Sequence, residues 1–345
     1  MKNKNELPIQ PNEINESTKA SMKTRIITGI VAGVVVFPIL IFGDYPIIAL
    51  ILFALACCVY EIIKCAGKKY SVWLYIISFI LAILITFWPI VISLFNSLTG
   101  GIVPNYTYVP IDNWRLFSQF SSLIVPVFTL IIGATILFVT VVFDPGFEVR
   151  DACYVFTTVV VVSMGLQSIL LLRLIPLYET SIHTDSILPY FSFYNNFESS
   201  SLLFFVIIGT FMSDIGAYFI GVFFGKHKMN PRVSPKKTWE GFVGGIVFSA
   251  LFSFAFAFIL ALCGHPMLSF LDVSHWYLIL ILSLIIPPVA VLGDFVFSSI
   301  KRSYNVKDFG KILPGHGGVL DRIDSIIFTM MITALIITLC VYWMK

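Results

Sequence analysis

Long apolar stretches follow one another along almost the whole chain, and short polar segments separate them. A hydrocarbon core of about 30 Å needs about 20 mostly apolar residues in one helix. The first two stretches in the chain are short and separated by only two residues, so we expect them to form a tight helical hairpin. The alternative is that one of them is re-entrant. The pattern predicts nine spans: Ile26–Gly43, Pro46–Ile63, Val72–Phe95, Leu123–Phe143, Ala152–Leu172, Leu202–Phe224, Phe242–Cys263, Trp276–Phe297 and Ser325–Tyr342.

The basic residues gather on one side of this arrangement. With the N-terminus in the cytoplasm, 19 of the 22 Lys and Arg fall in cytoplasmic segments, and only Arg115, Arg173 and Lys345 fall outside. Such an excess is typical of the cytoplasmic side of membrane proteins. We therefore predict an all-α polytopic membrane protein with about nine transmembrane helices, a cytoplasmic N-terminus and an outside C-terminus.

Three regions follow from this pattern. Residues 1–25 form a polar cytoplasmic tail, and residues 26–200 form about five transmembrane helices with outside loops. Residues 201–345 contain the remaining helices and the two largest cytoplasmic loops, where polar residues concentrate. We expect the chemistry of the protein to lie in this third region.

Composition excludes several other classes of protein. Hydrophobic residues make up 58% of the chain and charged residues only 12%, whereas soluble domains carry about 25% charged residues. An ordinary cytosolic enzyme and a disordered protein are therefore excluded. The six Cys form neither a CxxC pair nor a spaced framework, which excludes a disulfide scaffold. A net charge of +3 is too small for nucleic-acid binding by bulk electrostatics, so we expect no nucleic-acid partner.

Two carboxylates inside predicted spans stand out, because a charge there is costly and often marks a functional site. Asp214 lies in the sixth span, about 15 Å from its cytoplasmic end at 1.5 Å per residue. Asp294 lies nearer the same surface in the eighth span. The structural alternative is a pair of residues hydrogen-bonded within the helix bundle.

The two large cytoplasmic loops, 225–241 and 298–324, follow these same spans. The Lys and Arg of these loops can be explained as signals that keep the loops in the cytoplasm. Such a signal explains neither the sequence Pro-Gly-His-Gly-Gly at Pro314–Gly318 nor the carboxylates between the cations. Asp321 and Asp324 are three residues apart at the start of the ninth span, so they share one face of its first turn.

Cations and carboxylates in this combination indicate chemistry on phosphates. Lys and Arg bind phosphate groups, glycine-rich turns bring backbone N–H groups close to an anion, and Mg²⁺ takes few carboxylates beside phosphate oxygens and water. The four Asp can thus converge on one pocket at the inner leaflet, where they would support phosphoryl or nucleotidyl transfer. The run Gly315–Gly318 is not followed by Lys-Ser/Thr, which excludes a P-loop. The five His form no zinc-ligand cluster.

The stretch Ser298–Asp324 resembles the C-terminal signature of the phosphatidate cytidylyltransferases, also called CDP-diacylglycerol synthases. The upstream stretches Asp214–Tyr218, Gly225–Lys228 and Ser234–Gly241 are also similar to that family. Two positions depart from its pattern: Phe297 stands where a Glu is common, and Val222 stands where a basic residue is frequent.

The resemblance implies that the protein transfers CMP from CTP to phosphatidic acid, giving CDP-diacylglycerol and pyrophosphate for phospholipid synthesis. It implies Mg²⁺ with a second cation such as K⁺, and membrane lipids and a second copy of the chain as partners. We expect the bacterial plasma membrane, with the active site facing the cytoplasm, because no organelle-targeting segment is recognisable.

The resemblance also suggests roles for individual residues. Asp214 and Asp294 are the first candidates for metal ligands and Asp321 the next, whereas Asp324 could instead orient Arg322. Catalytic roles fall to Asp214, Asp294, Asp321, Lys301 and Arg302. His316 could equally be a loop-packing residue, and Ser234 and Thr238 could equally be helix caps. The candidate substrate-binding residues are Lys226, Ser234, Lys236, Lys237, Thr238, Lys307, His316, Gly317, Gly318 and Arg322.

Two alternatives stay open at this stage. One is another enzyme of the same group, such as a CTP-dependent lipid kinase or cytidylyltransferase with a different lipid. The other is a cation-coupled membrane transporter, because intramembrane carboxylates also suit ion coupling. The sequence shows no repeat between its halves, and its polar residues gather at one membrane face instead of along a path.

Overall fold

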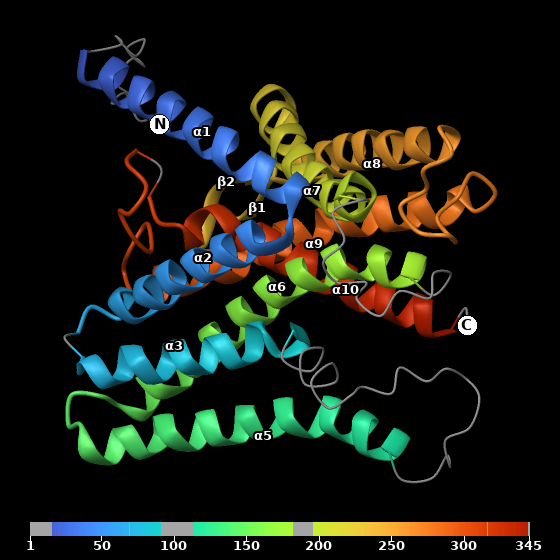
Figure 1. Ribbon diagram of the computed structural model, residues 1–345. Helices are drawn as coiled ribbons and strands as arrows, with labels where there is room; N and C mark the ends of the chain where they lie inside the picture. Colours follow the sequence, from blue (N-terminus) through green and yellow to red (C-terminus); the bar gives the residue numbers. More distant parts are fainter. Residues whose placement is uncertain (1–15, 69, 91–113, 182–195, 316, 344–345) are drawn as a thin grey trace, which may run out of the picture.

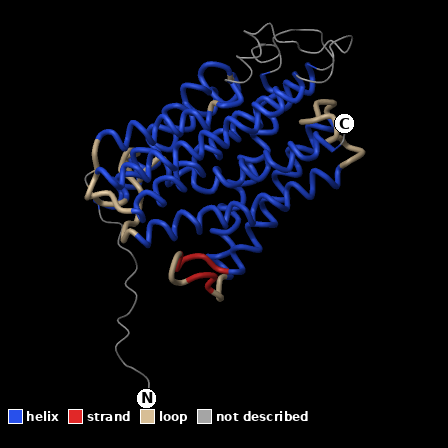
Figure 2. Tube along the Cα trace, turned by 90° about the horizontal axis from the view of Figure 1, so that it is seen from below, coloured by secondary structure: helices blue, strands red, loops and turns tan. Residues whose placement is uncertain are grey.

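The computed structural model describes residues 16–68, 70–90, 114–181, 196–315 and 317–343. Within them, long helices run alongside one another and a single two-stranded hairpin projects from their ends (Figures 1 and 2). The elements are α1 (Glu16–Phe42), α2 (Asp44–Cys65), α3 (Val72–Thr86), α5 (Trp114–Phe143), α6 (Val149–Ser181), α7 (Asn196–Phe224), β1 (Lys228–Asn230), β2 (Ser234–Thr238), α8 (Trp239–Leu262), α9 (Trp276–Ser303) and α10 (Leu320–Trp343).

The prediction of an all-α polytopic membrane protein is confirmed. Within the described residues, seven helices are long and apolar enough to cross a membrane, and two shorter apolar helices, Ile27–Phe42 and Val72–Thr86, match the first and third predicted spans. A chain in lipid must satisfy its backbone hydrogen bonds internally, which is why each apolar stretch is helical. The number of nine spans and the sides of the termini stay predictions.

The connections alternate between the two ends of the bundle. In Figure 1 the α9–α10 connection lies at the left end, whereas the α8–α9 connection and the C-terminus lie at the right end. The hairpin β1–β2 projects from the helical body (red in Figure 2). It turns at Asn230, whose side-chain oxygen accepts a hydrogen bond of 3.3 Å from the Val233 N–H.

The first two helices meet in a turn at Gly43, where φ is 66°. Arg173 from α6 is buried beside this turn and donates to the carbonyl oxygen of Ile41 at 3.2 Å. A side chain on Gly43 would overlap the Arg173 guanidinium, so this turn requires glycine. The expected tight hairpin is therefore present as a turn, and whether both of its helices cross the membrane remains a prediction.

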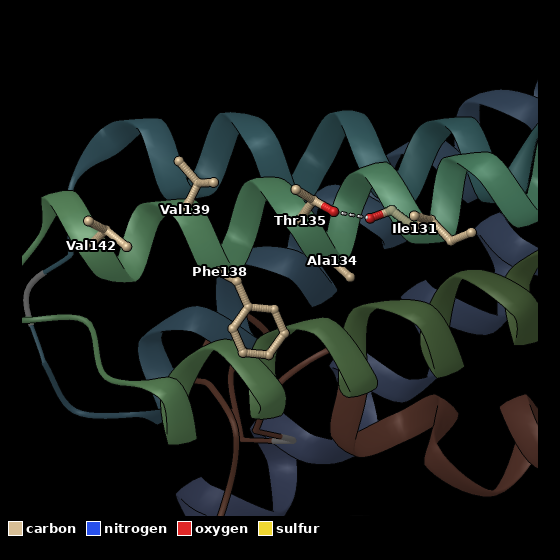
Figure 3. A pocket seen from close by; sticks show the side chains of 6 residues that line it. All are labelled: Ile131, Ala134, Thr135, Phe138, Val139 and Val142. Atoms are coloured by element: carbon tan, nitrogen blue, oxygen red, sulfur yellow. Dashed lines mark hydrogen bonds between the residues drawn. The ribbon is translucent and has the colours of Figure 1, made fainter.

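Burial is uneven across the bundle. The apolar core is formed chiefly by α2, α3, α6, α7, α9 and α10. Helix α5 lies against this core with one face and leaves the other exposed, including Val142 and Phe143. A shallow apolar hollow follows the exposed face (Figure 3), and its lining residues are Ile131, Ala134, Thr135, Phe138, Val139 and Val142. An exposed apolar face of this kind suits contact with lipid tails.

Most helix ends differ from the expected boundaries, and three of these ends lie at the loops that carry the candidate chemistry. Helix α9 continues to Ser303, so Lys301 and Arg302 lie on a helix; α8 begins at Trp239 and α10 at Leu320. Hydropathy does not predict these terminal helix turns, because their residues are polar and polar stretches are assigned to loops. The outside loops predicted at residues 96–122 and 173–201 lie only partly within the described residues, and the described parts belong to helices α5, α6 and α7 because these helices extend beyond the apolar stretches.

Candidate active site

Helices α7 and α8 pack backbone against backbone, and this contact fixes the position of Asp214. A Cβ atom on Gly241 would lie 2.7 Å from the carbonyl oxygen of Ala217, and one on Gly245 would lie 2.8 Å from that of Ser213. Only glycine permits such an approach. Asp214 follows Ser213 directly, so the glycines of α8 set the depth at which its carboxylate stands.

The first turn of α8 holds the base of the hairpin. Thr238 is the N-cap, and its hydroxyl accepts a hydrogen bond of 3.2 Å from the Gly241 N–H. Glu240 accepts from the backbone N–H groups of Lys226 and His227 at 3.1 and 3.2 Å, and it also pairs with the His227 ring at 2.6 Å. Thr238 thus acts as the helix cap that the sequence left as an alternative, and the hairpin is held firmly next to α7.

Lys237 at the end of β2 reaches across to α9. Its ammonium forms an ion pair with Asp294 and also stands 4.9 Å from the centre of the Phe295 ring. Both members of this pair, which we call the open pair, keep about a quarter of their side-chain surface exposed, 24% and 25%. Asp214 on α7 is exposed and lies within electrostatic reach of both. Three separate elements therefore bring two carboxylates and one cation together.

A second pair lies deeper, between α9 and α10. The Lys301 ammonium is 2.9 Å from Asp321 and 3.9 Å from Asp324. The side chains of Lys301 and Asp321, the closed pair, are only 9% and 4% exposed. The other oxygen of Asp321 accepts hydrogen bonds from the N–H groups of Phe309 and Gly318, at 2.8 and 3.1 Å. Asp321 is thus fully engaged within the protein.

The loop between α9 and α10 is a tight turn around its glycines. Leu313 and Gly317 exchange two backbone hydrogen bonds of 2.9 and 3.2 Å, and Gly315 and Gly317 both have positive φ. The N–H groups of Gly317 and Gly318 are engaged inside the loop, so these glycines shape the turn. Their expected contact with a phosphate stays a prediction, and His316 lies outside the described residues.

The remaining candidate cations lie on the surface around these pairs. Arg302 donates to the carbonyl oxygen of Val306 at 3.4 Å. Ser234 is part of β2, in register with Asn230 of β1. The exposed cations of the candidate set are Lys226, Lys236, Arg302, Lys307 and Arg322.

The four candidate metal ligands fall into two unequal sets. Among the described residues, no three His, Cys, Asp or Glu side chains are close enough together to hold a metal ion. Mg²⁺ needs only one or two protein carboxylates when phosphates and water complete its shell. Asp214 and Asp294 fit that requirement, since Asp214 is exposed and the Asp294 side chain keeps a quarter of its surface exposed. Asp321 and Asp324 are occupied by Lys301 and by backbone N–H groups and fit it less well.

Two further positions near the site stand out. Phe297 is buried, and its ring packs edge-on against Phe309 and Phe328, so an apolar contact joins α9, the loop and α10 there. Glu61 of α2 was missed in the sequence. It is completely buried and accepts hydrogen bonds from Val319 and Leu320. The signal that could have found it is a carboxylate inside an apolar span, the same signal that marked Asp214.

Comparison with known proteins gives one family. A model of the cytidylyltransferase family matches residues 23–340. A phosphatidate cytidylyltransferase of Bacillus subtilis is 40% identical over 152 residues, which are 44% of this chain and 53% of that protein. Proteins of the same name from Staphylococcus saprophyticus and Mycobacterium leprae are 41% and 36% identical, over 39% and 41% of this chain and 47% and 42% of their own length. The matched stretches thus span about half the length of these relatives.

Proposed function

The chain belongs to the cytidylyltransferase family, and on that premise we propose that it transfers CMP from CTP to phosphatidic acid. The products are CDP-diacylglycerol and pyrophosphate. The observation that supports this most strongly is the group Asp214, Lys237 and Asp294, which joins α7, β2 and α9 at the base of the basic hairpin. The named relatives are phosphatidate cytidylyltransferases, and the family resemblance of loop 298–324 points the same way.

The reaction suits a site with charged groups and no strong base. An oxygen of the phosphatidate phosphate attacks the α-phosphorus of CTP, and the bond from that phosphorus to the bridging oxygen breaks to release pyrophosphate. The attacking phosphate is already an anion, so no proton has to be removed from it. Catalysis then depends on holding two anionic reactants in line and neutralising their charge.

The exposed cations are placed for the first of these tasks. Lys226 just before the hairpin and Lys236 on it, with Lys307 on the α9–α10 loop, would hold phosphate oxygens. Lys237 is held by Asp294 beside Asp214, where its charge would help to neutralise the reacting phosphates. Asp214 lies about 15 Å along α7 from its last residue, Phe224. An exposed carboxylate at that depth favours a polar opening toward the lipid headgroups.

Mg²⁺ is part of the proposal, with Asp214 and Asp294 as its protein ligands and K⁺ as a candidate second cation. When bound, Mg²⁺ would supply charge neutralisation to the attacking and departing oxygens. We also propose that this site faces the cytoplasm of a bacterial plasma membrane. The skew of Lys and Arg toward the hairpin end and the bacterial source of the relatives support that assignment.

Release of pyrophosphate tests the function. Purified protein in phosphatidate-containing micelles is given CTP and Mg²⁺, and pyrophosphate and labelled lipid are measured together. We expect both products in equal amounts, and neither without phosphatidate or after chelation of Mg²⁺. Turnover only with another lipid would favour a related enzyme of the group. No turnover, with ion flux in vesicles, would favour the transporter. Cross-linking in the same micelles would show whether the protein is a dimer.

A further inference from the structure

Glu61 is a buried carboxylate that no proposed step uses. It lies near the end of α2, four residues before Cys65, and no part of its surface is exposed. Burial of an isolated carboxylate is costly unless strong hydrogen bonds compensate it. Its partners come from the far end of the chain: Oε1 accepts from the Val319 N–H at 3.0 Å, and Oε2 accepts from the Leu320 N–H at 2.9 Å.

These two N–H groups mark the beginning of α10. The first amides of a helix have no partner within it, and the positive end of the helix dipole favours a negative charge there. Helix α10 starts at Leu320, so Glu61 acts as a cap supplied by a different helix. Each carboxylate oxygen accepts a hydrogen bond from one backbone N–H group. An amide side chain could not replace it fully, because it has only one acceptor oxygen.

The loop before α10 is shaped around the same carboxylate. A Cβ atom on either Gly310 or Gly318 would overlap the Glu61 carboxylate, so the chain passes it closely at both positions. Asp321 accepts hydrogen bonds from the N–H groups of Phe309 and Gly318. Two carboxylates from distant parts of the sequence thus hold four amides of one loop, and that loop carries Lys307 and leads into Arg322.

We propose that Glu61 is a positioning residue for the substrate-binding loop between α9 and α10. It acts through the loop and touches no reacting atom, and its catalytic meaning rests on the proposed function. The N-terminal helices are then part of the active centre, because α2 fixes where the phosphate-binding cations of the loop stand.

The test compares wild-type protein with Glu61→Gln, which preserves size but replaces one acceptor oxygen with an NH₂ group. Loss of one buried hydrogen bond to a charged group should raise the KM for CTP at least about fivefold. A merely destabilised protein would show a lower apparent kcat with an unchanged KM, because its surviving folded molecules are intact. Glu148→Gln, the same substitution at an exposed carboxylate, should leave KM unchanged.

Two measurements support the kinetic one. In Glu61→Gln, residue-resolved hydrogen exchange should speed up at Val319 and Leu320, while Phe309, held by Asp321, keeps its wild-type rate. Gly310→Ala should also raise KM, and it should do so less in a Glu61→Ala background, where the overlap is removed.

Wild-type KM together with wild-type exchange at Val319 and Leu320 in Glu61→Gln would overturn the proposal. So would equal effects of Gly310→Ala in both backgrounds. If the wild-type protein itself shows no turnover, the proposed function fails instead, and the exchange measurement still decides whether Glu61 holds the loop.

Discussion

Two lysine–aspartate pairs stand at the same end of the bundle and differ in almost everything except their residue types. In the open pair, Lys237 and Asp294 keep about a quarter of their surface and stand beside a third exposed charge, Asp214. In the closed pair, Lys301 and Asp321 are nearly fully buried, and backbone amides occupy the oxygen that the lysine leaves free.

The difference separates the groups that can meet a ligand from the groups that hold the site together. A carboxylate with exposed oxygens can exchange its lysine for a cation or a phosphate-bound metal. A buried carboxylate with every oxygen engaged cannot do so without leaving buried donors unpaired. The two pairs consist of the same residue types, so their different roles follow from their different burial and hydrogen bonds. Four predictions test this contrast.

Asp321→Asn should have the largest effect, on stability. It would leave the Lys301 charge buried without its closest partner, and breaking one side of a buried ion pair costs about 3–5 kcal/mol. We expect a large fall in the unfolding temperature of the purified protein, measured by intrinsic fluorescence in detergent. A variant with wild-type stability and no turnover would place Asp321 with the open pair.

Asp294→Asn should leave the fold intact and remove activity. The substitution preserves shape and deletes the charge that we assign to the metal, so turnover should fall about 100- to 1,000-fold. Pyrophosphate release measures it, and the unfolding temperature should stay close to that of the wild type. Asp272→Asn, the same change in the α8–α9 connection, is the control and should keep full activity. A wild-type rate in Asp294→Asn would contradict the metal assignment.

Lys237→Gln should act on substrate binding more than Lys236→Gln. Lys237 is held beside two carboxylates and Phe295, whereas its neighbour is exposed on the hairpin. We expect the KM for CTP to rise about tenfold for Lys237→Gln and less than about threefold for Lys236→Gln. Equal effects of the two substitutions would mean that the hairpin acts only through its net charge.

Lys68 extends the comparison to the surface, and its effect should be the smallest. It pairs with Glu148 at 3.0 Å and Asp151 at 2.8 Å, and these hydrogen bonds raise the pKa of Lys68 above its usual value. A raised pKa stabilises the folded state fully below the unfolded value of about 10.4, and that contribution disappears as pH rises through the folded pKa.

Thermal unfolding across a pH series checks this last case. The unfolding temperature of Lys68→Gln should lie at most about 3 °C below that of the wild type. That difference should be the same at pH 7 and pH 9 and should shrink above about pH 10.4. A difference that disappears below pH 9 would mean that the pair with Asp151 does not hold in solution.

The helices were predictable because lipid leaves the chain little choice: each apolar stretch has its helix in the described residues. The helix ends at the candidate site could not be predicted in this way. Helix α9 runs six residues past the expected Phe297, because Ser298–Ser303 are stabilised by packing that hydropathy does not register. The hairpin β1–β2 was also missed, since its short strands carry lysine and proline instead of alternating apolar residues.

The sequence identified the residues of both lysine–aspartate pairs as candidates, but it did not predict which of them pair. Sequence picked out all four aspartates, but nothing in it distinguishes Lys236 from Lys237 or assigns Asp321 to Lys301. Glu61 carried the same signal as Asp214, a carboxylate in an apolar span, but its partners were not predictable because they are backbone amides, which residue types do not reveal. The only mark on the partner side is the pair of glycines that make room for it, Gly310 and Gly318.

The distance along the chain between Glu61 and its amides has a consequence for biogenesis. Those donors lie 258 and 259 residues downstream, at the start of the last helix. While the ribosome is still synthesising the chain, the Glu61 carboxylate near the end of α2 lacks these two hydrogen bonds. They form only when the start of α10 has been synthesised. Every nascent chain that stops before Val319 therefore lacks the two backbone donors that bind the Glu61 carboxylate.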